Sequence, residues 1–165
     1  MSNIARWTGG NLESSVWGGA LFGSSDLNGL ANGDSILSSL SDWDNTGTPD
    51  TWLDANIELT IASNTIAAGA YIGLYIAYLI EDGSHYGDNQ FTTATGASAA
   101  VPSWQPFGII QVPALSSTTA IRGSCGGIIL RKKFRMLLTN NCGFALASSG
   151  AGNVYFDTSD INLNG

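Results

Sequence analysis

Two adjacent segments within residues 53–80 limit most strongly what this chain can fold into. Residues 53–61 alternate apolar and polar side chains, with Leu53, Ile57 and Leu59 among the apolar positions. This period of two is typical of a strand with one buried and one solvated face. Residues 66–80 form an apolar run whose second part is rich in Ile, Leu and Tyr, which predicts a strand buried on both faces. Together the two segments predict a strand hairpin at the centre of a β-sheet domain.

Further short strands are expected along the rest of the chain, separated by turns rich in Gly, Pro and Asn. We predict them within residues 35–43, 107–112, 118–122, 128–130, 134–139, 145–147 and 153–157. Gly126 and Gly127 are interpreted as a turn or bulge before the strand at 128–130. No segment has the period of an amphipathic helix. About eight strands with long connections favour an all-β fold, a jelly-roll-like β-sandwich.

The length of 165 residues suits one domain, which we place at residues 34–165. Residues 1–33 are rich in glycine and have no clean period, so they are interpreted as an extended N-terminal arm. Trp7, Trp17 and Phe22 would dock this arm in grooves of its own domain or of a neighbouring subunit. The other interpretation of the segment is a partly ordered terminus.

Charge is scarce and unevenly placed. The net charge is −7, and charged residues make up 12% of the chain, about half of the usual ~25%. No Lys or Arg lies between residues 7 and 121, which argues against general nucleic-acid binding. Arg131, Lys133 and Arg135 would share one face of a strand, with Phe134 and Met136 on the other face. That basic face would contact an acidic partner, including another copy of this acidic chain, or would be a solvated strand face.

The chain lacks the motifs of the common catalytic and metal sites. His85 is the sole histidine and lies in a turn-rich loop, without a GxSxG motif elsewhere. Carboxylates gather in residues 42–54 and 81–88, where they could form a glycosidase pair or a calcium loop, although solvated loop carboxylates are the simpler interpretation. We therefore expect no enzymatic activity, no metal and no cofactor. Cys125 and Cys142 are interpreted as buried thiols, with a disulfide left open.

No signal peptide is visible, and the apolar run at 66–80 is shorter than the roughly 20 residues that span a bilayer. We therefore expect a soluble protein made in a cytoplasm, with no membrane partner. The segment 83–105 is long for a connection inside a compact domain, and such connections are often functional. Its aromatic residues, Tyr86, Phe91 and Trp104, are candidate partner-binding side chains.

The order of several short motifs resembles that of small virion proteins of tailed bacteriophages. These motifs are Asp44-Asn45-Thr46, residues 53–60 (LDANIELT), 81–88 (EDGSHYGD), 134–143 (FRMLLTNNCG) and 147–150 (ASSG). The chain is similar over residues 35–157 to the jelly-roll decoration (cement) proteins that lie on the outside of the capsid.

The resemblance implies a non-enzymatic protein of the capsid exterior, made in the host bacterial cytoplasm. Such a protein forms a dimer or trimer and binds across neighbouring major capsid subunits. The candidate partner-binding residues are then Trp7, Trp17, Phe22, Tyr86, Phe91, Trp104, Arg131, Lys133 and Arg135. The alternative is a jelly-roll carbohydrate- or receptor-binding module of a phage tail or fibre. In that case Trp43, Trp52, Tyr86 and Trp104 would stack on sugars.

Overall fold

The structure of the chain is a computed structural model. It describes residues 5–8, 22–23, 25–38, 43–46, 51–62, 66, 68–80, 105–114, 120–130 and 132–163, with the backbone alone at 5–8 and 159–163. The regular secondary structure of these ranges is entirely β. The strands are β1 (Ala5–Thr8), β2 (Ser35–Leu37), β3 (Trp43–Asp44), β4 (Trp52–Thr60), β5 (Tyr71–Tyr78), β6 (Gln105–Gln111), β7 (Ala120–Ile128), β8 (Lys133–Asn141) and β9 (Gly152–Leu163).

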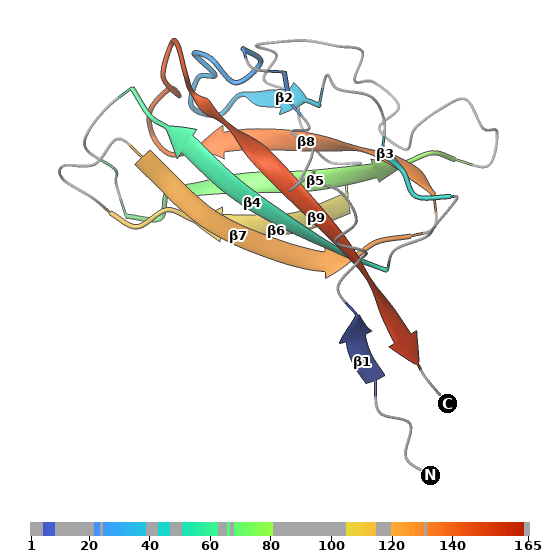
Figure 1. Cartoon of the computed structure of the whole chain (residues 1–165). Helices are drawn as coiled ribbons and strands as arrows, with labels where there is room; N and C mark the ends of the chain where they lie inside the picture. The colour runs from blue at the N-terminus through green and yellow to red at the C-terminus, as the bar shows by residue number, and fades with distance from the viewer. Residues whose placement is uncertain are drawn as a thin grey trace.

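The strands form two antiparallel sheets that pack face to face (Figure 1). One sheet has the order β1-β9-β4-β7, and the other has the order β2-β8-β5-β6 with the short β3 paired to β8. Apart from the steps β2–β3 and β5–β6, each connection passes from one sheet to the other. The two four-strand orders β1-β9-β4-β7 and β2-β8-β5-β6, without the additional β3, have the connectivity of a jelly roll. The predicted all-β, jelly-roll-like sandwich is therefore confirmed.

The predicted hairpin of residues 53–61 and 71–80 is wrong, because β4 and β5 belong to different sheets. β4 pairs with β7 and β9, whereas β5 pairs with β6 and β8. The alternation in β4 is nevertheless real, since Leu53, Ala55, Ile57 and Leu59 are buried between exposed neighbours. Alternation reports which face of a strand is buried. It does not report which strand lies beside it in the sheet.

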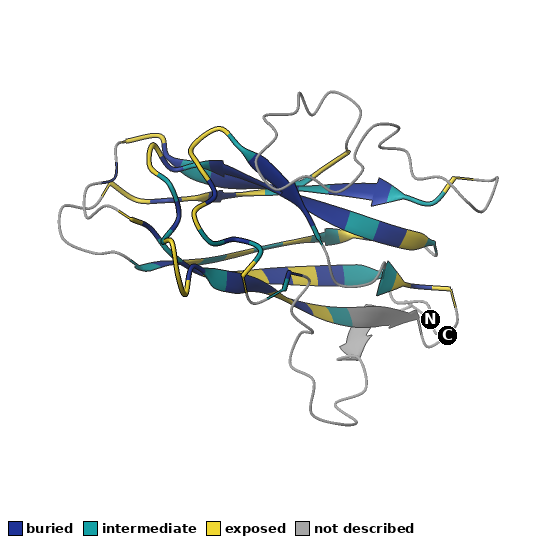
Figure 2. Ribbon diagram, turned by 90° about the horizontal axis from the view of Figure 1, so that it is seen from above, coloured by how far each residue is buried: buried dark blue, intermediate teal, exposed yellow. Residues whose placement is uncertain are grey.

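The burial of β5 on both faces is confirmed. Ile72, Leu74 and Ile76 point into the main core between the sheets. On the opposite face, Ala77 joins Leu37 and Leu137 in a second buried cluster, against which Tyr75 and Leu79 pack. Figure 2 shows the two layers edge-on, with continuous burial along some strands and alternating buried and exposed bands along others.

The glycines predicted to form a turn or bulge lie inside the strand β7. Residues 118–122 and 128–130 were expected to be separate strands, but β7 runs unbroken through Gly123, Gly126 and Gly127. A Cβ atom at Gly123 would lie 2.4 Å from Cγ2 of Ile110 on β6, and one at Gly127 would lie 3.3 Å from the ring of Phe107. These glycines therefore let β7 approach β6 closely where the two sheets meet.

Two further boundaries differ from the predictions. The strand expected at 35–43 is two short strands, β2 and β3, both paired with β8. The segment expected at 145–147 contributes an isolated bridge between Leu146 and Ile61, and β9 extends from Gly152 to Leu163. β1 was not among the predicted strands, and Figure 1 shows it beside the end of β9, beyond the packed sheets.

Part of the segment 1–33 packs inside the domain. Phe22, Leu27 and Leu30 are buried members of the main core. The side-chain amide of Asn153 donates a hydrogen bond of 2.8 Å to the carbonyl of Phe22, which fixes this segment against β9. Isolated apolar residues in a turn segment can join a core without any periodic pattern. Residues 1–4, 9–21 and 24 of the predicted arm lie outside the described residues.

Candidate binding surfaces

The predicted partner-binding residues differ in whether the structure describes them and in whether their side chains are exposed. Trp17, Tyr86, Phe91, Trp104 and Arg131 lie outside the described residues. Trp7 is described by its backbone, which pairs with Ile161 of β9. Phe22 is 0% exposed, so its ring is a core side chain of its own domain and offers no surface to a partner.

The predicted alternation of the basic strand is confirmed in β8. Phe134 and Met136 are buried in the main core, while Lys133 and Arg135 lie on the outer face of the sheet. Lys133 is half-exposed and forms an ion pair of 3.2 Å with Asp44 of β3. The basic side chain is therefore already neutralised in part by a carboxylate of its own chain.

Asp44 belongs to a small hydrogen-bonded turn. Its Oδ1 accepts hydrogen bonds from the hydroxyl of Thr46 at 2.5 Å and from the backbone N–H of Thr46 at 3.1 Å. These bonds, with Lys133 as the second contributor, hold the pKa of Asp44 below its ordinary value of 3.8. The side chain of Asn45 donates to the carbonyl of Leu130. No group of three possible metal ligands occurs among the residues that the structure describes.

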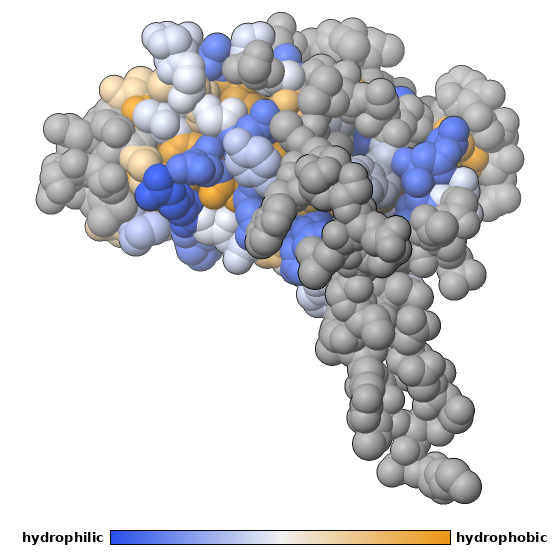
Figure 3. Space-filling model, in the orientation of Figure 1, coloured by the Kyte–Doolittle hydropathy of each residue, from blue (hydrophilic) through white to orange (hydrophobic). Residues whose placement is uncertain are grey.

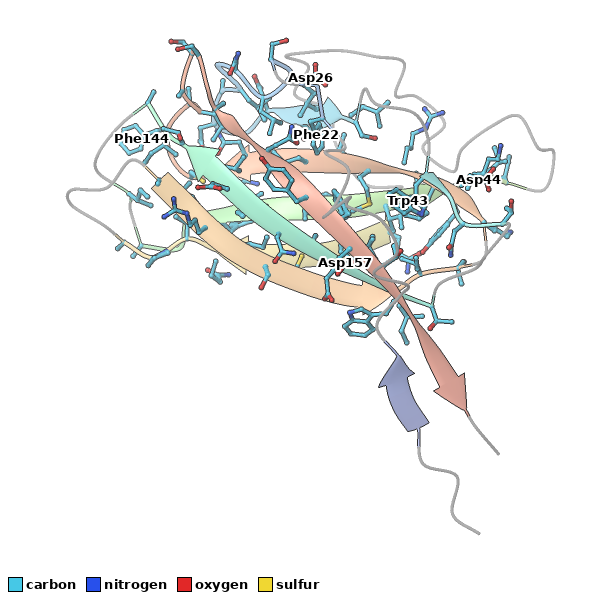
Figure 4. The ribbon with its side chains drawn as sticks, in the orientation of Figure 1. Phe22, Asp26, Trp43, Asp44, Phe144 and Asp157 are labelled. Carbon is cyan, nitrogen blue, oxygen red and sulfur yellow. The ribbon has the colours of Figure 1, made fainter. Side chains whose placement is uncertain are left out.

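Trp43 does not serve as an exposed sugar-stacking residue. Its ring stacks on Phe134 with a centroid distance of 6.3 Å, and Tyr78 meets Phe134 edge to face at 6.0 Å. Figure 4 shows Trp43 and Asp44 at one end of the sandwich, on β3. The hydroxyl of Tyr78 accepts a hydrogen bond from the backbone N–H of Leu130, and burial raises the pKa of Tyr78. These aromatic rings therefore close the core at this end.

Exposed apolar side chains gather at the same end of the sandwich. Ile80, Ile128 and Leu130 are 45%, 73% and 50% exposed. Leu130 is held beside β5 by its bond to Tyr78, and the backbone N–H of Leu79 donates to the carbonyl of Lys133. We call Ile80, Ile128 and Leu130 the apolar end. The ion pair of Lys133 and Asp44 lies on the neighbouring strands β8 and β3, and exposed apolar side chains of this size are typical of protein-interaction surfaces.

The outer face of the sheet formed by β9, β4 and β7 has a different character. Four rows of paired residues cross this face (β9, β4, β7): Ser159, Trp52 and Ile128; Asp157, Asp54 and Gly126; Tyr155, Asn56 and Ser124; Asn153, Glu58 and Arg122. Glu58 and Arg122 form an exposed ion pair of 2.7 Å. Figure 4 shows Asp157 on β9 where this strand crosses the front of the sandwich. Hydrophilic and hydrophobic residues are interspersed on this face in Figure 3, where grey atoms do not cover it.

The side chain of Trp52 is oriented by a hydrogen bond on this outer face. Its indole Nε1 donates a hydrogen bond of 2.9 Å to Oδ1 of Asp54. A Cβ atom at Gly126 would lie 2.4 Å from that carboxylate oxygen and 3.0 Å from Cζ2 of the indole. The ring and the carboxylate therefore both lie over the Gly126 backbone, in space that any larger residue would fill. We call Trp52, Asp54, Asn56, Tyr155 and Asp157 the aromatic face.

Sequence reasoning named Trp52 but missed its companions. Tyr155 and Asp157 alternate with the buried Val154 and Phe156, so their exposure was readable from the sequence. Their position beside Asn56 and Asp54 could not be predicted from the sequence, because it depends on the register between β4 and β9. Asp54 and Asp157 lie on an outer sheet face, and a glycosidase needs its two carboxyl groups to flank a bound sugar in a cleft.

The two cysteines are free thiols; Cys142 is buried as expected, whereas Cys125 is half-buried. Burial raises the pKa of Cys142 to about 11. Burial, together with the nearby charge of Asp54, raises the pKa of Cys125 to about 11. Thiols with so high a pKa carry little thiolate at neutral pH, which makes both poor nucleophiles and poor metal ligands.

One shallow hollow lies near the turn that precedes β2. It is lined by Asp26, Asn28, Gly29, Leu30, Ala31, Asp34 and Ile36. Its volume of about 190 Å³ is below the roughly 300–1,000 Å³ of small-molecule sites. Asp26 is occupied there by the backbone N–H of Gly23, at 2.7 Å. We therefore regard the two surfaces above as the stronger candidates.

No protein-family model, curated protein or solved structure matches the chain. Within the described residues, no helix is long and apolar enough to cross a membrane.

Proposed function

We propose that this chain is a non-enzymatic structural protein of a tailed-phage virion. In this proposal it decorates the outside of the capsid and stabilises the shell by binding across neighbouring major capsid subunits. The jelly-roll strand order agrees with the fold that the sequence resemblance implies. Because one fold serves many functions, the proposal rests on the surface as well as on the fold.

The observation that carries the proposal is the apolar end. Ile80, Ile128 and Leu130 expose large apolar side chains in a chain whose surface carries few charges. Burying these side chains against capsid subunits would remove apolar area from water at about 25 cal/mol per Å². The polar but uncharged surface around them is inexpensive to desolvate. Both features favour a protein that works while partly covered by its neighbours.

Attachment to a repetitive shell makes modest contacts sufficient. If the chain forms a dimer or trimer, as proposed, each oligomer contacts several capsid subunits at once, so the contacts act at high effective concentration. A protein that binds only the assembled shell stabilises it by mass action. No cofactor, nucleic acid or membrane takes part in this function.

The test is binding to empty shells assembled from the major capsid protein of the same genome. We expect the wild-type protein to co-sediment with shells and to raise their melting temperature. Replacing Ile80 and Leu130 together by serine should weaken binding at least about tenfold, a loss of about 1.4 kcal/mol. Ile109→Ser is the matched control, because Ile109 is 55% exposed and lies opposite Gly73 near the other end of β5.

Two results would overturn the proposal. One is a folded wild-type protein that does not bind shells. The other is a double variant that binds as tightly as the Ile109→Ser control, which would remove the apolar end from the contact. The alternative, a carbohydrate- or receptor-binding module of a tail or fibre, predicts no binding to shells and retention on host cell-surface glycans.

A further inference from the structure

We propose that β7 is the edge at which two copies of this chain pair, antiparallel and about a two-fold axis, so that one sheet continues across a dimer. β7 is an outermost strand of the sheet β1-β9-β4-β7. The proposal concerns the chain in solution and does not depend on attachment to a capsid.

Among the strands that the structure describes, β7 is the longest at an edge of its sheet. It has nine residues, whereas β1 has four, β2 has three and β6 has seven. β6 also contains Pro106 and a register shift against β5, and both features hinder the addition of another strand. β7 has no proline, its pairing with β4 is continuous, and three of its residues are glycines. Such an edge is a template for pairing with another chain.

The outer face of β7 carries an exposed cation near the start of the strand. Arg122 donates from Nε and Nη2 to the same oxygen of Glu58, at 3.1 and 2.7 Å, and its side chain is 72% exposed. A guanidinium has five N–H donors in a planar fork. Arg122 can therefore bind a second carboxylate without giving up the first.

A carboxylate lies over the same strand four residues later. A Cβ atom at Gly126 would be 2.4 Å from Oδ1 of Asp54, so this exposed carboxylate sits above the Gly126 backbone. Ser124 lies midway between Arg122 and Gly126 and is exposed on the same face. A two-fold axis beside Ser124 thus places Arg122 of each copy opposite Gly126, and beside Asp54, of the other copy.

Other registers of the two strands are less favourable. A two-fold axis perpendicular to the sheet keeps both outer faces on one side, so outer residues oppose outer residues. An axis at Gly123 would bring the two Arg122 side chains together, and an axis at Cys125 would place Arg122 opposite Ile128. The axis at Ser124 gives each Arg122 a carboxylate. It also sets two serine hydroxyls opposite each other, where they can share a hydrogen bond.

Charge complementarity identifies the occupant of this edge as a second copy. The net charge of the chain is −7, so two copies repel each other over most approaches. At the β7 edge each copy offers one cation and one carboxylate in positions that a two-fold axis exchanges. Such a self-complementary patch is what a two-fold contact between identical chains requires. The pairing also closes the edge, so that no further copy adds to β7.

The first experiment measures the mass of the full-length chain by analytical ultracentrifugation over a range of concentrations, without shells. We expect a reversible dimer. Ser124→Lys sets two ammonium groups opposite each other at the axis and should weaken the dimer at least about tenfold. Ser124→Val is the matched control, since it adds a β-branched side chain without charge and should dimerise at least as well as wild type. Far-UV circular dichroism checks that both variants are folded.

The second experiment tests the ion pair. Asp54→Asn keeps an oxygen for the Trp52 indole but removes the charge, and it should weaken the dimer about three- to tenfold. Added salt should weaken the wild-type dimer more than the Asp54→Asn dimer. Asp157→Asn removes the same charge from β9, one strand further from the edge, and should not weaken the dimer.

The proposal is overturned if the folded wild-type chain stays monomeric at every concentration, or if it forms a trimer. It is also overturned if Ser124→Lys associates as tightly as Ser124→Val. Equal effects of Asp54→Asn and Asp157→Asn would contradict the register centred on Ser124. Ile80 and Leu130 lie outside β7, and these measurements contain no shells, so self-association and shell binding can fail separately.

Discussion

The side-chain amide of Asn140, fully buried in β8, donates a hydrogen bond of 2.9 Å to the carbonyl of Leu30. The same amide donates to the carbonyl of Phe144, and its oxygen accepts from the backbone N–H of Cys142. One polar side chain therefore joins the turn before β2 to the turn after β8. The carbonyl of Leu30 also accepts from the backbone N–H of Leu146, so the buried N–H of Cys142 depends more strongly on the Asn140 side chain.

Asn140→Leu should lower the free energy of unfolding by about 2–4 kcal/mol, because it removes three hydrogen bonds and with them the side-chain acceptor of the buried Cys142 N–H. Urea unfolding of the full chain measures the change. Asn56→Leu, at an exposed position on β4, is the control and should shift stability by less than about 0.5 kcal/mol. A loss below 1 kcal/mol for Asn140→Leu would show that water replaces the amide at these turns.

Two glycines with positive φ separate backbone strain from steric exclusion. Gly150 and Gly152 have φ values of 62° and 94°. A Cβ at Gly150 would meet nothing within 4 Å, whereas one at Gly152 would lie 1.9 Å from the carbonyl oxygen of Glu58. Gly150→Ala should cost about 1 kcal/mol from strain alone. Gly152→Ala should cost at least about 3 kcal/mol, since β9 must move away from β4.

Thermal unfolding of the two variants tests this contrast. Equal losses of stability would mean that β9 shifts freely at its start, and that the register between Gly152 and Leu59 is not fixed by close contact.

How well the sequence predicts a feature of this fold depends on how far apart along the chain the interacting residues lie. The alternation of β4 and the apolar run of β5 correctly predict their burial, because burial is encoded in each strand by itself. Their sheet partners are not encoded in that way. The neighbours of β4 begin at Ala120 and Gly152, and nothing in the spacing of residues 52–60 indicates them. A hairpin between consecutive strands was the reasonable expectation, and the jelly-roll crossover overrides it.

The candidate surfaces were predictable in part for the same reason. Exposure of Tyr155 and Asp157 follows from alternation, but the row that joins Asp157, Asp54 and Gly126 requires three strands in register. Gly126 was misinterpreted because a glycine in a turn and a glycine beneath an indole look alike in sequence. Trp43 shows the converse error. The alternative function required an exposed ring at this position, and its stacking on Phe134 places it against the core.

The cysteine pKa values predict low thiol reactivity. Because both pKa values are raised to about 11, each native thiol should carry about a hundredfold less thiolate at pH 8 than a thiol with the ordinary value of 9. Alkylation by iodoacetamide should accordingly be slow in the native protein and fast in urea. Cys142→Ala and Cys125→Ala variants assign the remaining rate to one thiol. Native alkylation as fast as that of the unfolded chain would contradict the burial of these groups.

The same shifts predict a dependence of stability on high pH. A thiol whose pKa is higher in the folded state than in the unfolded state stabilises the fold fully below the unfolded value, here 9. That contribution is lost as the pH rises through about 11. The free energy of unfolding should therefore decline between these two values. The double Cys→Ala variant should lose part of that slope, and an identical slope would assign it to other groups.

Asp44 gives the corresponding prediction at low pH. Its pKa lies below the ordinary 3.8, first because of the Thr46 hydroxyl and second because of Lys133. A carboxyl with a depressed pKa stabilises the fold above the unfolded value, and the contribution is lost as the pH falls through the folded value. NMR titration of the Asp44 carboxyl should therefore show a midpoint below 3.8.

Thr46→Val should raise that midpoint more than Lys133→Met does. Added salt should shift the midpoint little in Lys133→Met, since its remaining cause is a local hydrogen bond, and more in Thr46→Val, where the ion pair remains. The opposite order of the two variants would identify the ion pair, and not the turn, as the main cause of the lowered pKa of Asp44.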